Sequence, residues 1–183
     1  MKRILLMAML IAGVCTVKAQ PNFTLKSDQI SGQAIMSQVF DGFGCTGKNI
    51  SPELSWVNAP AGTKSFAITL YDPNAPTGSG WWQWVIFDIP ANVKELVQNA
   101  GDVKKELAPK GAIQIRNDYG LYGYGGPCPP ADGRIHEYIF TIYALKVPSL
   151  GLKSDAGAPM VGFYIMANTI EKASLVMYYQ RNK

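Results

Sequence analysis

Residues 123–145 read GYGGPCPPADGRIHEYIFTIYAL, a loop made largely of Gly and Pro that leads into an apolar run. Proline fixes φ and has no N–H, and glycine reaches backbone angles closed to other residues, so this loop is predicted to be rigid and sharply turned. The following residues alternate with a period of two, which predicts a strand over 137–146 with His136 and Tyr138 on its apolar face. His136, the only histidine of the chain, therefore stands where a stiff loop meets a strand, a position typical of a pocket wall.

A second motif precedes this one. A predicted central strand over 65–71 ends at Asp72-Pro73-Asn74-Ala75-Pro76, and Gly80-Trp81-Trp82-Gln83-Trp84 follows. Together with Pro129-Pro130 and His136-Glu137-Tyr138, this motif resembles the phosphatidylethanolamine-binding protein (PEBP) family, in its bacterial Raf-kinase-inhibitor-like branch. The resemblance runs from Asn22 to the C-terminus.

The resemblance implies one β-rich α+β domain over residues 20–183. Its PEBP-like fold would have a central antiparallel or mixed β-sheet with short peripheral and C-terminal helices. It also implies a small cavity that binds phosphate or phosphorylated head groups. The residues that match the family's cavity positions are Asp72, Gln83, Pro129, Pro130, His136 and Tyr138, with Pro76 and Trp82 shaping the wall.

Gln83 departs from the family pattern, because the family has a histidine at this position of a Trp-Trp-His-Trp cluster. A glutamine amide can donate to an anion but cannot become cationic. His136 is then the one protonatable histidine of the cavity, and the unperturbed pKa of this residue type is about 6.5. We therefore predict weaker and less pH-dependent phosphate binding than the family norm. We expect Asp72 to orient His136 and favour its imidazolium form, while Tyr138 and loop N–H groups donate to the anion.

Each of these residues also has a purely structural interpretation. An Asp before Pro commonly forms a turn, a single histidine is more often structural than functional, and a tyrosine on a strand usually belongs to the core. The order and spacing of the two motifs, taken jointly, favour the pocket.

A catalytic role has less support. Ser51 and Ser79 are available hydroxyls and His136 is an available base, but the sequence has no Gly-x-Ser-x-Gly elbow. One His and two Cys make no spaced set of metal ligands, and Asp132, which could pair with Asp72, lies in a loop. We expect a binding protein and not an enzyme, with no cofactor and no metal.

Residues 1–19 have the pattern of a secretory signal peptide, with basic Lys2-Arg3, an apolar stretch from 4 to 14 and a small-residue cleavage site at Val17-Lys18-Ala19. The apolar stretch is too short to span a membrane easily, so we expect a periplasmic or secreted protein without stable membrane insertion. Cys15 suggests a lipoprotein as an alternative, which the bulky Val14 disfavours. Three of the 17 Lys and Arg residues lie in this leader, so 14 basic residues face 13 acidic ones. That balance argues against a nucleic-acid partner.

Cys45 and Cys128 are the two cysteines outside the leader. In an oxidising compartment they could form a disulfide, which would close a long loop and contribute roughly 4 kcal/mol in the chain-entropy model. Two small buried thiols are the alternative, because the sequence gives no distance between them.

The remaining patterns predict short elements. Strands are expected at 23–26, 35–40, 54–56, 84–89 and 112–115, with one helical turn within 93–101. A helix is expected from near Ala156. A second is expected over 170–179, where Ile170, Ala173, Val176 and Met177 recur at helical spacing.

Two functions are compatible with this sequence. The first is an exported binding protein that holds a small anionic or phosphorylated ligand. The alternative is an inhibitor of an extracytoplasmic protease, or of another protein partner, that acts through its surface while the cavity is vestigial. Either could be a monomer or a homodimer.

Overall fold

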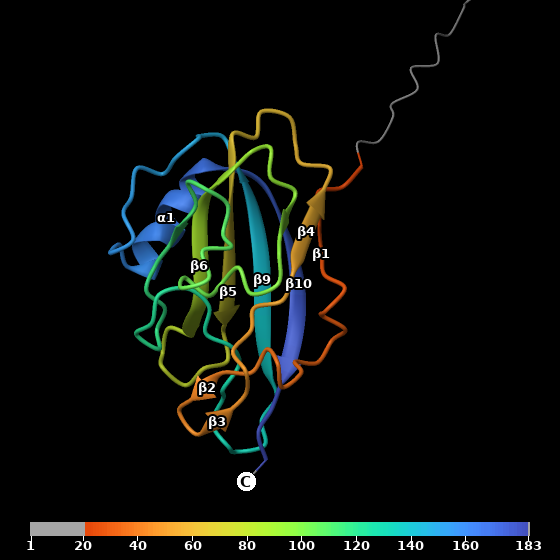
Figure 1. Ribbon diagram of the computed structural model, residues 1–183, viewed down its shortest axis with the longest axis vertical. Coiled ribbons are helices and arrows are strands. Elements are labelled where there is room, and N and C mark those ends of the chain that lie inside the picture. Colours follow the sequence, from red (N-terminus) through yellow and green to blue (C-terminus); the bar gives the residue numbers. More distant parts are fainter. Residues whose placement is uncertain (1–20, 183) are drawn as a thin grey trace, which may run out of the picture.

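The structure is a computed structural model that describes residues 21–182. Four long segments rich in apolar, β-branched and aromatic residues, together with the two-residue strand β8, form the central antiparallel sheet, in the order β10-β9-β5-β6-β8 (Figure 1). Its strands are β5 (Ser65–Asp72), β6 (Trp81–Pro90), β8 (Ile113–Gln114), β9 (His136–Leu145) and β10 (Thr169–Tyr179). β9 has the predicted alternation, because His136, Tyr138 and the apolar residues in register with them are all buried.

The other elements pack around this sheet. A three-stranded antiparallel sheet has the order β1-β4-β7, and a two-residue ladder joins β2 and β3. The bounds are β1 (Thr24–Lys26), β2 (Asp41–Gly42), β3 (Cys45–Thr46), β4 (Leu54–Val57), β7 (Glu95–Leu96) and α1 (Ala158–Asn168).

The core lies on both faces of the large sheet. On one face Phe66, Trp84 and Phe140 pack with Leu25 and Trp56 of the small sheet, in a sandwich of two sheets. On the opposite face, residues of β5 and β6 pack against the inner side of α1, so α1 and the small sheet lie on opposite sides of the large sheet (Figure 1). The β-rich fold with a central antiparallel sheet is as predicted.

The helix predicted over 170–179 is wrong, because this segment is strand β10. It pairs antiparallel with β9 along nearly its whole length, from Thr169 opposite Leu145 to Tyr179 opposite His136. The segment also contains a two-residue pattern: Ala173, Leu175, Met177 and Tyr179 pack against the core. Once β10 pairs with β9, its side chains alternate between two faces, and one face covers the core. The two-residue period therefore describes this segment, and the helical period does not.

Two further local predictions are also wrong. Residues 35–40 form a turn, in which the N–H groups of Gln38 and Val39 donate to the carbonyl of Ile35. Residues 93–101 contain β7 followed by turns in place of a helical turn. The helix predicted near Ala156 is confirmed as α1, and Pro159 is tolerated there because it lies in the first turn.

The leader predicted over residues 1–19 lies outside the described residues. Between residues 21 and 182, no helix has the length and apolar character needed to cross a membrane.

Candidate functional site

The site lies at one end of the large sheet, beside the last residue of β5 and the first residue of β9. β5 ends at Asp72 and β9 starts at His136, and since these strands are antiparallel neighbours, the two side chains lie together. His136 Nδ1 is 2.8 Å from Asp72 Oδ2, and both side chains are buried. A carboxylate only accepts, so Nδ1 carries the proton. The ring atom left for a ligand is Nε2.

Asn74 fixes this pair to the backbone. Its N–H donates to Asp72 Oδ1 at 2.8 Å, which closes an Asx turn through Pro73, and its own Oδ1 accepts from the N–H of Glu137 at 2.8 Å. The turn that sequence analysis offered as the structural interpretation of Asp72 is therefore present. It holds the same carboxylate against His136.

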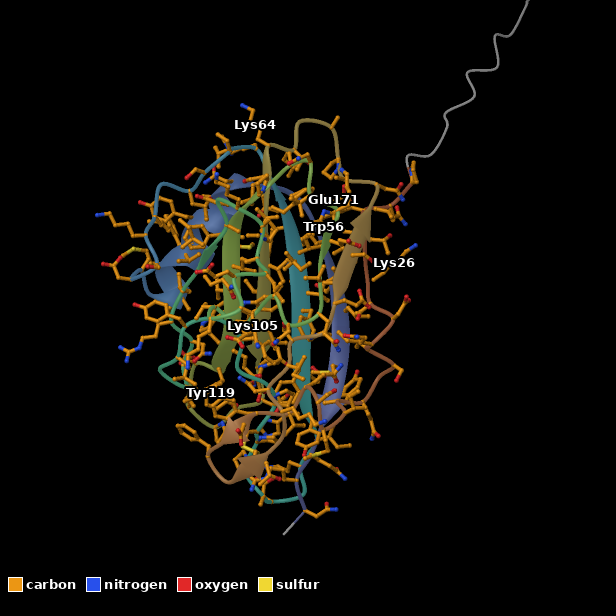
Figure 2. The ribbon with its side chains drawn as sticks, in the orientation of Figure 1. Lys26, Trp56, Lys64, Lys105, Tyr119 and Glu171 are labelled. Atoms are coloured by element: carbon orange, nitrogen blue, oxygen red, sulfur yellow. A yellow bond between two sulfur atoms is a disulfide. The ribbon has the colours of Figure 1, made fainter. Side chains whose placement is uncertain are left out.

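A cavity of about 270 Å³ opens over the pair. Six of the eight predicted site residues line it: Asp72, Pro76, Gln83, Pro129, Pro130 and His136. The other lining residues are Phe43, Ala75, Thr77, Trp81, Tyr119, Cys128 and Arg181. Figure 2 labels Tyr119 at this end of the molecule, next to the β2–β3 hairpin. We call this region, formed by the β2–β3 hairpin, the loop 125–136 and the tail 180–182, the pocket end.

Trp82 and Tyr138 do not line the cavity. The register between β5 and β6 shifts beside Leu70, which pairs with Trp84, whereas Tyr71 pairs with Trp82. Trp82 therefore packs on Tyr71 and toward Gly162 of α1. Trp81 lines the cavity in its place. Tyr138 is fully buried under the site, and its hydroxyl has no hydrogen-bond partner among the described residues.

Gln83 acts as a link between segments. With its amide in the orientation that its neighbours require, Nε2 donates to the carbonyls of Gly125 at 2.7 Å and Gly126 at 3.1 Å. The N–H of Gly125 donates to the carbonyl of Gln83, and that of Gly126 to Asn49 Oδ1, each at 2.8 Å. These donors, which we expected to face an anion, are thus used within the protein.

The loop 125–136 can pass close to the backbone of Gln38 because residue 126 is glycine. A Cβ at Gly126 would lie 1.9 Å from the carbonyl oxygen of Gln38, so any side chain would push the two backbones apart. A disulfide also ties the loop down, since Cys128 is bonded to Cys45 with Cα atoms 6.0 Å apart. The disulfide joins the proline-rich loop to the β2–β3 hairpin.

Arg181 is a cavity residue that the sequence analysis missed. It follows β10, whose course was predicted wrongly, so its position could not be inferred. Its Nη2 donates to the carbonyl of Gly44 at 2.7 Å and its Nη1 to that of Pro129 at 3.2 Å. The tail thus lies across the hairpin and the proline-rich loop, near the C-terminus marked in Figure 1. The remaining signal in the sequence was the two basic residues at the chain end, Arg181 and Lys183.

Two tyrosines at the site hold their protons strongly. Burial, and next the negative charge of Asp72, raise the pKa of Tyr138 far above its usual range. The same two causes, in the same order, raise the pKa of Tyr119, whose hydroxyl donates to the carbonyl of Gly126 at 3.0 Å. Both side chains therefore remain neutral at physiological pH.

The His136–Asp72 pair has the geometry of a base with its orienting carboxylate. Among residues 21–182, however, no serine, threonine or cysteine side chain is hydrogen-bonded to His136. The same part of the chain contains no group of three His, Cys, Asp or Glu residues that could hold a metal ion. The arrangement can bind a ligand and exchange a proton with it at Nε2.

The fold and the cavity define a class of protein built on an antiparallel sheet, with a buried His–Asp pair beneath a cavity at the ends of two central strands. The family model named "Phosphatidylethanolamine-binding protein" matches residues 26–180, and the chain belongs to this family.

Individual relatives agree with that assignment. The chain is 45% identical over 160 residues to the UPF0098 protein YbcL of Escherichia coli K12, covering 86% of this chain and 87% of that one. It is also 45% identical over 141 residues to the UPF0098 protein YbhB of the same organism, covering 77% and 88% of the two chains.

Solved structures show the same fold. The crystal structure of E. coli YbcL matches with a TM-score of 0.85 at 44% identity and covers 88% of this chain and 99% of that one. A PEBP homologue from Chlamydia trachomatis matches with a TM-score of 0.70 at 28% identity, covering 87% and 98%.

Proposed function

We propose that this protein is an exported binding protein that holds a small anionic or phosphorylated ligand in the cavity over the His136–Asp72 pair. The leader predicted over residues 1–19 supports export to the periplasm or the medium. We take residues 20–183 to be the single mature domain. The family is named for binding, so the cavity is treated as a binding site and not as a catalytic one.

The observation that carries the proposal is the fixed orientation of His136. Its Nδ1–H is engaged by Asp72 at 2.8 Å, and no residue from 21 to 182 hydrogen-bonds Nε2, although the ring lines the cavity. When the ring is protonated, Nε2–H is a charged donor that faces the cavity, which matches a phosphate or carboxylate oxygen.

The test is calorimetric titration of the purified protein with phosphate, phosphoethanolamine and sulfate at pH 6 and pH 8. Phosphoesters gain a second charge near pH 6, which alone strengthens their binding as the pH rises. Sulfate keeps its charge over this range. If His136 supplies a proton to the anion, sulfate binding weakens from pH 6 to pH 8.

His136→Gln is the matched variant, because the amide retains a donor for Asp72 while it removes the possible cation. We expect weaker binding and a loss of the pH dependence for sulfate, with circular dichroism confirming the fold. If the wild-type protein binds none of the three anions at either pH, the proposal is wrong. Action on a protein partner through the surface, with a vestigial cavity, then becomes the better account.

A further inference from the structure

We infer that the ligand of this cavity is an anion that carries an apolar substituent, and that Arg181 holds its charged group while Phe43, Trp81 and Tyr119 hold the substituent. This inference rests on the proposed function and names the ligand class of the same site.

Arg181 carries a positive charge that no Asp or Glu among residues 21–182 balances. Within residues 21–182 the ion pairs are Arg134–Asp132 and His136–Asp72, so neither Asp nor Glu in this part of the chain pairs with Arg181. Its guanidinium is held in place by the carbonyls of Gly44 and Pro129. Nη1 also donates to Cys128 Sγ at 3.6 Å, so these contacts use up to three of the five N–H groups. The remaining donors of an arginine fork suit an anion well. A positioned cation that no carboxylate of residues 21–182 balances indicates an anionic ligand at this cavity wall.

The charges at this wall also explain how a site with Gln83 could still hold an anion. Gln83 is uncharged, and its amide nitrogen is engaged by Gly125 and Gly126. Asp72 is hydrogen-bonded to His136 at 2.8 Å, and the histidine balances its charge only when the ring is protonated. Arg181 is therefore the basic side chain that remains among the cavity residues.

Most of the cavity wall is apolar. Tyr119 packs edge-on against Phe43 with ring centroids 5.3 Å apart and against Trp81 at 5.4 Å, so three aromatic rings form one continuous surface. A bare phosphate ion would contact little of this surface. The volume of about 270 Å³ is several times the share of one water molecule, about 30 Å³, and leaves room for more than a tetrahedral anion.

Phe43 indicates where the substituent lies. It stands at the tip of the β2–β3 hairpin with 69% of its side chain exposed and with a φ of 52°. A bulky residue in the left-handed region is a conformational outlier, and such outliers concentrate at ligand sites. Cys45, two residues after Phe43, is bonded to the cavity residue Cys128, which fixes the hairpin tip beside the cavity. A ligand that covers Phe43 would remove this apolar surface from water.

The experiment compares phosphate with phenyl phosphate at pH 8, where both probes are mostly doubly charged. Calorimetric titration of the wild-type protein should give tighter binding of phenyl phosphate, by roughly 3- to 10-fold for one added aromatic contact. Arg181→Gln should weaken both probes by about 10-fold or more, the loss expected for a hydrogen bond to a charged group. Phe43→Ala should weaken only phenyl phosphate.

Arg116→Gln is the control for the charge change. Arg116 is exposed and, like Arg181, donates to a loop carbonyl, that of Gly120 at 2.8 Å, but it does not line the cavity. This variant should bind both probes as the wild type does.

The outcomes separate this inference from the proposed function. If Arg181→Gln binds both probes like the wild type while His136→Gln does not, Arg181 has no role and the inference is overturned, but the proposed function stands. If the wild type binds phosphate and phenyl phosphate with equal affinity, the inference that the ligand carries an apolar substituent is overturned. If the wild type binds no anion at all, the proposed function fails and the inference fails with it.

Discussion

The faces of the large sheet and its pocket end are held together by different forces. On the faces, fully buried Phe66, Trp84 and Phe140 contact apolar residues of the small sheet, and a second apolar cluster lies beneath α1. This stabilisation is non-directional and grows with the apolar area removed from water. Many substitutions of similar size could maintain it.

The pocket end has little regular structure, since β2 and β3 are two residues each. Such a hairpin is too small to be stable on its own. It is held by specific links between segments far apart in the sequence: the disulfide Cys45–Cys128, the bonds of Asn49 and Gln83 to the glycine loop, and those of Arg181 to Gly44 and Pro129. Each link has a defined geometry and can be removed singly, which allows this comparison to be tested.

Removing the disulfide should have the largest effect. Its cysteines are 83 residues apart, for which the chain-entropy model gives about 4.5 kcal/mol of stability. The double variant Cys45→Ser, Cys128→Ser should lose up to this amount in urea unfolding and should bind phosphate more weakly, because the hairpin is no longer tied to the proline-rich loop.

Phe66→Ala is the matched control in the apolar core. It should cost a comparable 3–5 kcal/mol of unfolding free energy but leave phosphate affinity unchanged. If the cysteine-free variant also binds phosphate normally, the pocket end does not depend on its cross-link, and the distinction between the two regions is lost.

Alkaline pH should lower the free energy of unfolding by nearly as much, through Tyr119 of the cavity wall and Tyr124 and Tyr138 of the core. Burial, and next the neighbouring Tyr119, raise the pKa of Tyr124, and the pKa of Tyr119 and Tyr138 is raised as well. Unfolded tyrosines ionise near pH 10, so above this value the unfolded chain loses three protons that the native protein keeps. This stabilisation is complete below pH 10 and is lost above it, at up to about 4 kcal/mol per pH unit.

Urea unfolding between pH 9 and pH 11, followed together with tyrosinate absorbance, measures that slope. Tyr124→Phe should reduce the slope by about one third, because one of the three groups is gone. An unchanged slope in this variant would mean that Tyr124 ionises alike in the native and unfolded states, contrary to its burial.

The contrast between the faces of the large sheet and the pocket end also explains which features the sequence could predict. β5 and β9 were predicted well, because their residue types and two-residue alternation report directly on burial in a sheet. β10 was not, because Ile170, Ala173, Val176 and Met177 satisfy a helical period, and only pairing with β9 excludes it.

The site was predictable where it depends on strand ends and less so where it depends on register. Asp72 and His136 come together because two adjacent antiparallel strands end and begin there. The choice of Trp81 over Trp82 follows from an irregularity beside Leu70, which no local pattern signals. Arg181 reaches the cavity only because β10 brings the chain end back to the β2–β3 hairpin, so its placement is a property of the whole fold.

The smallest expected effect concerns Tyr138, which belongs to both regions. It is a core residue of β9 by packing, yet its hydroxyl lies close enough to Asp72 for that charge to raise its pKa, and it has no hydrogen-bond partner among the described residues. An unsatisfied buried hydroxyl is unfavourable, so Tyr138→Phe should leave the free energy of unfolding unchanged or raise it by about 1 kcal/mol. Phosphate affinity should not change, because Tyr138 does not line the cavity. If the variant instead loses stability or affinity, the hydroxyl has a partner at Asp72 or on the ligand, and Tyr138 belongs to the site as the sequence predicted.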